Sequence, residues 1–162
     1  MKRTTTPKTL ALVVATVFVL GIVPGAEADP HRGCSVASLS GSFGFTSTGT
    51  LLPPAVPVPL AGPFGEIGRQ TFDGTGNTNG TATLSANGNI VRGVTIQGTY
   101  QVHPDCTGSM EVHIDPINVT AVLDFVIDDG GEEVRAIATG PGTIETRVYR
   151  KQFPQGHKPI ED

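Results

Sequence analysis

Ten residues in the C-terminal half of the chain, Asn118 to Ile127 (NVTAVLDFVI), decide how the fold is predicted. Apolar side chains occupy every second position, and mostly polar side chains stand between them. The apolar set is Val119, Ala121, Leu123, Phe125 and Ile127, and the polar set includes Asn118, Thr120 and Asp124. Because successive side chains of a strand point to opposite faces, this period of two predicts a β-strand with one apolar face.

Similar segments recur along the chain between tight-turn sequences. Asn87-Gly88-Asn89 is a strong hairpin signal, and Asp128-Asp129-Gly130-Gly131 is also typical of a turn. Between Asp29 and Asp162 there are 12 Val, 9 Ile and 15 Thr against 6 Leu, and β-branched side chains favour strands. Eight strands are predicted, over residues 42–50, 64–72, 81–86, 90–102, 109–114, 118–127, 132–138 and 143–150.

The short connections predict how these strands pair. Strands joined by tight turns pair antiparallel with their neighbours in sequence, since parallel pairing needs long crossovers. Closing the sheet removes its two exposed edges, and eight strands enclose room for side chains or one small ligand. We therefore predict an all-β fold, an eight-stranded antiparallel up-and-down barrel, with a β-sandwich as the alternative. Gly93 and Gly98 are expected to mark bends or bulges in the long fourth strand.

Residues 1–28 have the parts of a secretory signal peptide. A basic start precedes an apolar run from Leu10 to Val23, and Ala26-Glu27-Ala28 supplies small residues for a signal peptidase. A membrane anchor is the alternative, but the run of 14 residues is shorter than the ~20 that a spanning helix needs. We expect cleavage after Ala28, a secreted protein (extracellular or periplasmic) without a stable membrane anchor, a barrel domain over 29–150 and a polar tail over 151–162.

Export would place Cys34 and Cys106 in an oxidising compartment, where two cysteines are expected to form a disulfide. The bridge would close a loop of roughly 70 residues and stabilise the fold by about 4 kcal/mol in the chain-entropy model. The alternative is a redox or nucleophilic cysteine, which the lack of a Cys-x-x-Cys motif disfavours.

The charge of the chain narrows its partners. There are 15 Asp+Glu against 11 Lys+Arg, a formal net charge of −4. Nucleic acid needs a basic face to meet its phosphates. Anionic membrane surfaces attract basic segments, so the acidic balance disfavours binding to them as well. We therefore expect no nucleic-acid partner. The oligomeric state stays open.

Several short motifs, in order, resemble one family of proteins. They are Cys34-Ser35 with Ser38–Phe45, Thr71–Asn77, Gly98–Val102, Pro104–Ser109, Asp124–Ile127 and Pro141–Thr143. Together they make the region from Cys34 to Arg150 similar to small secreted bacterial proteins with an allene oxide cyclase barrel-like domain. The resemblance implies a calycin-like barrel with an apolar cavity. Enzymes on that barrel, plant allene oxide cyclase and bacterial polyketide cyclases, hold a flexible apolar substrate folded inside. No residue here matches their active-site motifs.

The strand period predicts which side chains line the interior. If Phe64 and Phe72 point inward, Glu66 and Gln70 do so as well. The expected ligand-lining set is Phe43, Phe45, Phe64, Glu66, Gln70, Ile96, Tyr100, Met110, Val112, Leu123 and Phe125. Glu66 and Tyr100 are the candidate catalytic residues, since a carboxyl group in an apolar barrel has a raised pKa and can act as general acid or base. The alternatives are a wetted Glu66 paired with Arg69 or another base, and a core Tyr100 bonded to backbone.

Other motifs predict little chemistry, and we expect no metal and no cofactor. Asp73, Thr75, Asn77 and Asn79 alternate as in a calcium loop, but Leu84 stands where the bidentate Glu belongs. His113 and Asp115 could share a metal only with a third ligand.

The segment from Leu51 to Pro63 holds five Pro, so it cannot be a central strand. We interpret it as an apolar flap over the barrel mouth, with a polyproline docking segment as the alternative.

These features lead to three functional hypotheses. The first is a secreted barrel that binds a small apolar or amphipathic ligand in its interior. The second is a cofactor-independent cyclase or isomerase, and the third is a non-catalytic scaffold that acts through its surface. An interior far smaller than the ~300 Å³ of typical ligand sites would favour the third hypothesis.

Overall fold

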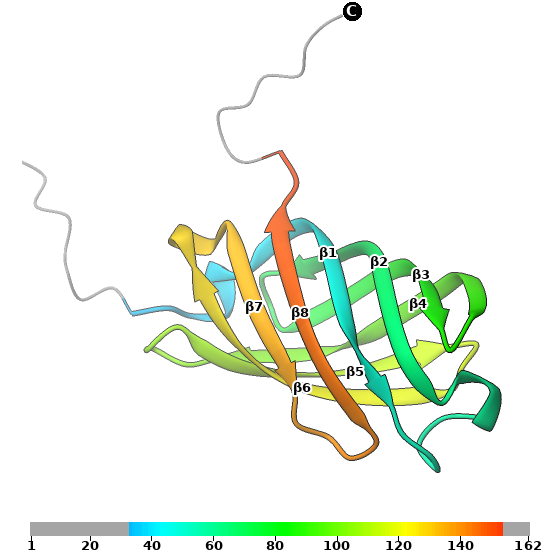
Figure 1. Cartoon of the computed structure of the whole chain (residues 1–162). Coiled ribbons are helices and arrows are strands. Elements are labelled where there is room, and N and C mark those ends of the chain that lie inside the picture. Colours follow the sequence, from blue (N-terminus) through cyan, green and yellow to red (C-terminus); the bar gives the residue numbers. More distant parts are fainter. Residues whose placement is uncertain (1–32, 154–162) are drawn as a thin grey trace, which may run out of the picture. The chain divides into compact units, whose positions relative to one another are not determined.

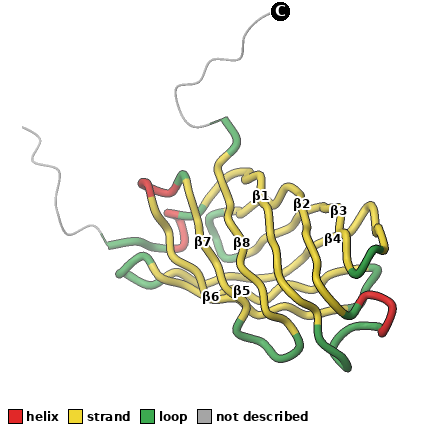
Figure 2. Tube along the Cα trace, in the orientation of Figure 1, coloured by secondary structure: helices red, strands yellow, loops and turns green. Residues whose placement is uncertain are grey.

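The computed structural model describes residues 33–153. The predicted signal peptide and residues 154–162 of the predicted tail lie outside these described residues. Eight strands and three short 3₁₀ turns make up most of the described part (Figures 1 and 2). The strands are β1 (Ser40–Leu51), β2 (Gly62–Asp73), β3 (Asn77–Ala86), β4 (Asn89–Val102), β5 (Thr107–Asp115), β6 (Val119–Asp128), β7 (Glu133–Ala138) and β8 (Thr143–Lys151). The 3₁₀ turns are η1 (Val36–Ser38), η2 (Val58–Leu60) and η3 (Asp129–Gly131).

The strands form one closed barrel in chain order, in which β8 pairs with β1. Every neighbouring pair is antiparallel, and Figure 1 shows β8 beside β1 where the sheet closes. The all-β class and the closed eight-stranded antiparallel barrel are thus confirmed, and the sandwich alternative is wrong. Closure pairs Phe45 with Tyr149 and Ser47 with Arg147. Side chains from the first and last strands therefore lie next to each other in the interior.

Strand boundaries agree with the prediction to within two residues except at β3, which begins at Asn77 rather than Thr81. The Asp73 carboxylate accepts hydrogen bonds from the backbone N–H groups of Thr75 (2.7 Å) and Asn77 (3.0 Å). This local bonding closes the turn in fewer residues, so Asn77 and Thr78 already pair with β4. In β4, the register shifts opposite Ala82 and Thr83, where Gly93 has φ +69°. The predicted irregularity at Gly93 is therefore a β-bulge, at a position that suits glycine.

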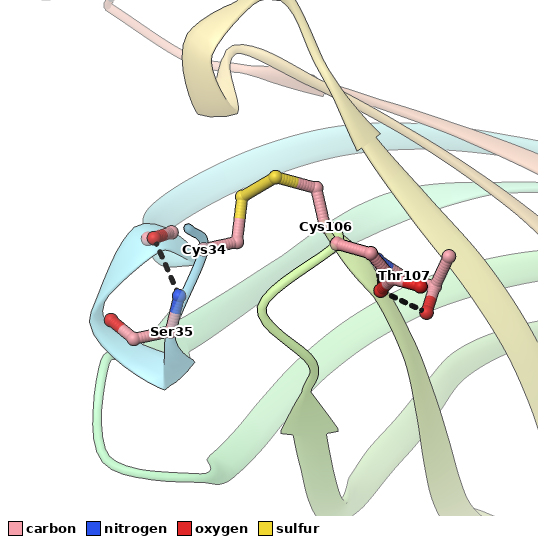
Figure 3. The surroundings of a disulfide bond; sticks show 6 residues. Cys34, Ser35, Cys106 and Thr107 are labelled. Carbon is pink, nitrogen blue, oxygen red and sulfur yellow. Dashed lines mark hydrogen bonds between the residues drawn. A yellow bond between two sulfur atoms is a disulfide. The ribbon is translucent and has the colours of Figure 1, made fainter. Parts of the chain in front are cut away.

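The predicted disulfide between Cys34 and Cys106 is present and fastens the lead-in before η1 to the β4–β5 turn (Figure 3). The backbone N–H of Cys34 also donates to the carbonyl of Pro104 at 3.1 Å. Because the strands run up and down, the β2–β3 and β6–β7 turns lie at this same end of the barrel. We call it the disulfide end.

The opposite end carries the β1–β2 connection with its prolines, together with the β3–β4, β5–β6 and β7–β8 turns. We call it the proline-rich end. Val56 of this connection is buried in the hydrophobic core, and Leu60 packs against it. The Asn89 side-chain amide donates to the Pro59 carbonyl at 2.8 Å, and the Leu52 N–H donates to the Gly142 carbonyl at 2.8 Å. The segment is thus held against the barrel by apolar contact and by hydrogen bonds to two neighbouring turns.

Candidate functional site

The barrel interior brings together every residue predicted to line it. Each of these side chains is buried, and the set is Phe43, Phe45, Phe64, Glu66, Gln70, Ile96, Tyr100, Met110, Val112, Leu123 and Phe125. The strand alternation explains this result, because the burial pattern of β2 places Phe64, Glu66, Gln70 and Phe72 on one face. The structure therefore puts both predicted polar residues, Glu66 and Gln70, inside.

Tyr100 lies at the disulfide end, where its hydroxyl is bonded to backbone. The hydroxyl donates to the Leu39 carbonyl at 2.7 Å and accepts from the Gly74 N–H at 2.9 Å. Its ring packs edge-to-face on Phe72, with the centroids 5.2 Å apart. These contacts fix the N-terminal lead-in and the β2–β3 turn on the barrel, which is a structural role for the Tyr100 hydroxyl.

Glu66 belongs to a buried charged cluster that we call the interior cluster: Glu66, Glu145, Arg147 and Ser47. Arg147 donates from Nη2 to Glu66 Oε2 at 2.9 Å, and both Nη2 (2.7 Å) and Nε (2.8 Å) contact Glu145 Oε1. The Ser47 hydroxyl donates to Glu66 Oε2 at 3.2 Å. The exposed fractions of Glu66, Glu145 and Arg147 are 7%, 4% and 2%, so an ion triad is enclosed in the barrel.

The pairing register explains how residues 81 positions apart meet. Ser47 of β1 is paired with Glu66 of β2 on one side and with Arg147 of β8 on the other. Because Ser47 is small, the two long side chains can reach each other across it. The alternative considered for Glu66 was a wetted side chain paired with Arg69 or another base. Arg69 is exposed on the outer face of β2, so Glu66 pairs with another base, Arg147, and is buried rather than wetted.

Tyr149 extends the polar network across the barrel. Its hydroxyl donates to Gln70 Oε1 at 3.1 Å, accepts from Arg147 Nη1 at 3.3 Å and lies 3.7 Å from the Met110 sulfur. Gln70 in turn donates to the Thr78 hydroxyl at 2.9 Å. One chain of polar contacts therefore runs from β8 through β2 to β3, with β5 in contact.

The three β8 residues of this network were missed in the sequence. Strand β8 alternates Ile144, Thr146 and Val148 with Glu145, Arg147 and Tyr149, and hydropathy alone would place the first set inside. The structure has the reverse, with Ile144 exposed and Arg147 buried. One signal could have found them. An inward Glu66 on β2 favours a basic partner that also points inward, and closure of the barrel brings β8 next to β1 and so near β2.

Burial controls the electrostatics of the interior cluster. Loss of solvent raises the pKa of Glu66 above its ordinary value, while Arg147 opposes this effect, Glu145 adds to it and the Ser47 hydrogen bond opposes it. Burial likewise raises the pKa of the Tyr149 hydroxyl. Because Arg147 stays protonated, two ionised carboxylates would give the cluster a net charge of −1, and one proton on Glu66 would neutralise it.

Each carboxylate of the cluster uses only one oxygen for hydrogen bonding. Oε2 of Glu66 and Oε1 of Glu145 accept all the bonds given above, and Oε1 of Glu66 and Oε2 of Glu145 accept none from the described residues. Among these residues, the one buried side-chain oxygen that is both enclosed and unpartnered is Oε2 of Glu132.

Small exposed fractions remain at several points inside the barrel. At the proline-rich end, Leu51, Ile114 and Val119 keep 6% and Phe64 keeps 8%, whereas Ala86 at the same end keeps 0%. Ala82 of β3 and Ala136 of β7 keep 7%, and Ile127 at the other rim keeps 9%. The side chains with no exposure include Phe43, Val94, Val112, Leu123, Val134 and Tyr149. Most of the interior is therefore filled by side chains.

The described part of the barrel has open hollows on its outer wall, and two of them are lined by apolar side chains as well as polar ones. One, of about 570 Å³, lies over β8, β1 and β2 beside Ile67 and Val148. The other, of about 490 Å³, lies over β5, β6 and β7 beside Val126, Arg135 and Ile137. Both hollows are lined mainly by outward-facing side chains, so they are surfaces of the barrel rather than its interior.

The remaining predicted motifs do not come together as a site in the described part. Both carboxylate oxygens of Asp73 accept hydrogen bonds from Thr75 and Asn77. His113 Nε2 lies 3.4 Å from Asp115 on the exposed end of β5, and no group of three metal-ligating side chains occurs among residues 33–153. Within the same residues, no helix has the length and apolar character to cross a membrane.

Comparison with known proteins gives no further assignment. No protein family matches the chain, and neither curated proteins nor solved structures gave a match. The resemblance to proteins with an allene oxide cyclase barrel-like domain stays a prediction.

Proposed function

We propose that the protein binds a small amphipathic molecule inside the barrel, with the apolar part at the proline-rich end and the polar part at the interior cluster. One observation carries the proposal. A barrel lined mostly by apolar side chains encloses an ion triad whose two carboxylates each keep one oxygen that accepts no hydrogen bond from the described residues. Buried ions contribute little net stability compared with apolar side chains, so a recognition role accounts for this arrangement better than stability does.

The ligand is proposed to reach the interior past the β1–β2 connection. That segment is held by Val56 and by hydrogen bonds from Asn89 and to Gly142, contacts that can break without disturbing the strand pairing. Leu51, Phe64, Ile114 and Val119, which keep small exposed fractions, lie at the same end. Because most of the interior is filled by side chains, we expect a ligand of modest size.

The second candidate is a cofactor-independent cyclase or isomerase, as in the enzymes that the sequence resembles. The raised pKa of Glu66 favours it, because burial makes the carboxyl group hold its proton more tightly, and a carboxyl group with a raised pKa is suited to act as general acid. Glu66 would be the catalytic residue of this activity. Tyr100 would not, because its hydroxyl is bonded to the backbone of Leu39 and Gly74.

We also propose that the protein is secreted after cleavage of residues 1–28. The Cys34–Cys106 disulfide supports this location, since disulfides persist mainly outside the cytosol. Mass spectrometry of the protein from its native culture tests it: we expect an N-terminus at Asp29 in the medium or periplasm, and an intact Met1 in the cell contradicts it.

The binding proposal is tested with 1-octanol as probe, followed by isothermal titration and by native mass spectrometry. Two matched variants locate the site: Ile114→Phe fills space at the proline-rich end, and Ile137→Phe makes the same change on the outer wall. We expect one bound octanol, weakened by Ile114→Phe and unchanged by Ile137→Phe, with circular dichroism confirming that both variants fold.

Two outcomes would contradict the proposal. If octanol binds but only Ile137→Phe weakens it, the ligand occupies the outer hollow. If the protein binds no octanol and carries no co-purifying mass from its native culture, the scaffold hypothesis, in which the surface acts, replaces interior binding.

A further inference from the structure

The interior cluster has an excess of hydrogen-bond acceptors over donors. The two carboxylates supply four oxygens, of which the described residues use only two, and Arg147 and Ser47 supply all the donors they receive. Arg147 is itself committed, because Nε and Nη2 hold the carboxylates and Nη1 donates to the Tyr149 hydroxyl. These contacts use four of the five guanidinium N–H groups, so an incoming polar group meets two free carboxylate oxygens and one remaining N–H of Nη1.

The charge of the interior cluster also favours a ligand that donates hydrogen bonds and carries a positive charge. Glu66 and Glu145 share one Arg147, so the ionised cluster lacks one positive charge. An anionic head group would add a second uncompensated negative charge in a buried site, which is costly. A cationic group with N–H donors would supply the missing charge and offer donors to the free oxygens, and such charge-assisted hydrogen bonds are stronger than neutral ones.

From this geometry we propose that the interior cluster is a binding site for a primary ammonium group on an aliphatic chain, held by Glu66 Oε1 and Glu145 Oε2. The inference rests on the proposed interior binding and specifies its ligand class. The apolar part of the ligand would lie against Leu51, Phe64 and Ile114, whose positions in their strands place them at the proline-rich end. An alkyl carboxylate is excluded by charge, and an alkyl alcohol binds with a single neutral donor.

The head-group experiment uses four probes with the same eight-carbon chain: n-octylammonium, 1-octanol, octanoate and n-octyltrimethylammonium. The last has the charge of the first but no N–H donor, so it reports attraction to an acidic protein in general. At pH 7 we expect octylammonium to bind about tenfold more tightly than octanol, from the added strength of charge-assisted hydrogen bonds. Octanoate and the trimethylammonium probe are expected to bind more weakly than octanol.

Two substitutions test whether the preference for octylammonium over octanol depends on the carboxylates of Glu66 and Glu145. Glu66→Gln and Glu145→Gln keep the side-chain shape but remove a charge, and each should reduce octylammonium affinity to about that of octanol. Glu133→Gln, at an exposed carboxylate paired with Arg150, is the matched control and should leave affinity unchanged. The four-probe series on the unaltered protein keeps the test valid if either interior variant fails to fold.

The outcomes separate this inference from the proposed function. Equal binding of octylammonium and octanol, tighter binding of octanoate, or tight binding of the trimethylammonium probe would overturn the ammonium site while leaving interior binding intact. Octylammonium binding that neither interior substitution weakens would overturn it as well. If none of the four probes binds, both the ammonium site and interior binding are wrong.

Discussion

Two walls of the same interior are built from different chemistry. Strands β4, β5 and β6 present apolar side chains such as Val94, Val112 and Leu123, all fully buried. Strand β8, with its neighbours β1 and β2, presents Glu145, Arg147 and Glu66 at similar depth. The apolar wall gains stability from every buried methylene, whereas the polar wall gains it only while its charges remain paired. The first wall therefore holds the fold together, and the second is where we expect specific recognition.

The largest effect should come from unpairing the polar wall. Arg147→Met leaves the carboxylates of Glu66 and Glu145 buried without a counter-charge, and removing one partner of a buried ion pair costs about 3–5 kcal/mol. Urea unfolding at pH 7 measures the loss.

A triple variant, Glu66→Gln with Glu145→Gln and Arg147→Met, is the control. Because it removes the charges together, we expect it to recover most of the lost free energy of unfolding. If it is as unstable as the single variant, the packing of Arg147 matters and its charge does not, and the difference between the two walls disappears.

The apolar wall should respond to truncation alone. Leu123→Ala is expected to lower the free energy of unfolding by about 3 kcal/mol, the middle of the range for buried Leu, with the same loss at pH 5 and pH 8. Ile137→Ala on the outer face, where the side chain is exposed, should cost about 0.5 kcal/mol or less. A loss at Leu123 that changed with pH would mean that the apolar wall is coupled to the charges.

A matched pair of glycine substitutions tests how closely β2 packs against its neighbours β1 and β3. A methyl group added at Gly68 would meet the Phe45 ring at 2.8 Å and also the Thr81 carbonyl oxygen. Gly68→Ala should therefore cost about 1–3 kcal/mol by overpacking. Gly65→Ala on the same strand has nothing within 4 Å and is expected to change stability by no more than about 0.5 kcal/mol. Equal effects of the two substitutions would contradict the close packing at Gly68.

The smallest effect is the pH dependence of the polar wall. The folded-state pKa of Glu66 is raised above its ordinary value of 4.5, so the folded state holds this proton more tightly than the unfolded state. The stability from the protonated form is complete below pH 4.5 and is lost as pH rises through the raised pKa. Relative to the unaltered protein, Glu66→Gln should therefore gain stability as pH increases. A difference that is constant with pH, or that falls, would contradict the direction of the shift.

The sequence was sufficient where the information is local. Tight turns and the period of two predicted the eight strands, the inward face of β2 and the burial of Phe43, Val112 and Leu123. The cysteine count predicted the disulfide. The partner of Glu66 could not be predicted, because it depends on the closure of β8 onto β1. Hydropathy also misleads in β8, where Ile144 and Val148 lie outside while Arg147 lies inside and pairs with Glu66 and Glu145.

The location of a bound alkyl chain tests the central claim most directly. Nuclear Overhauser contacts between n-octylammonium and the methyl groups of the protein would be measured by isotope-filtered NMR. Our account predicts contacts to Leu51, Ile114 and Val119, at the proline-rich end of the interior. Contacts confined to Val126, Ile137 or Ile67 on the outer wall would contradict it.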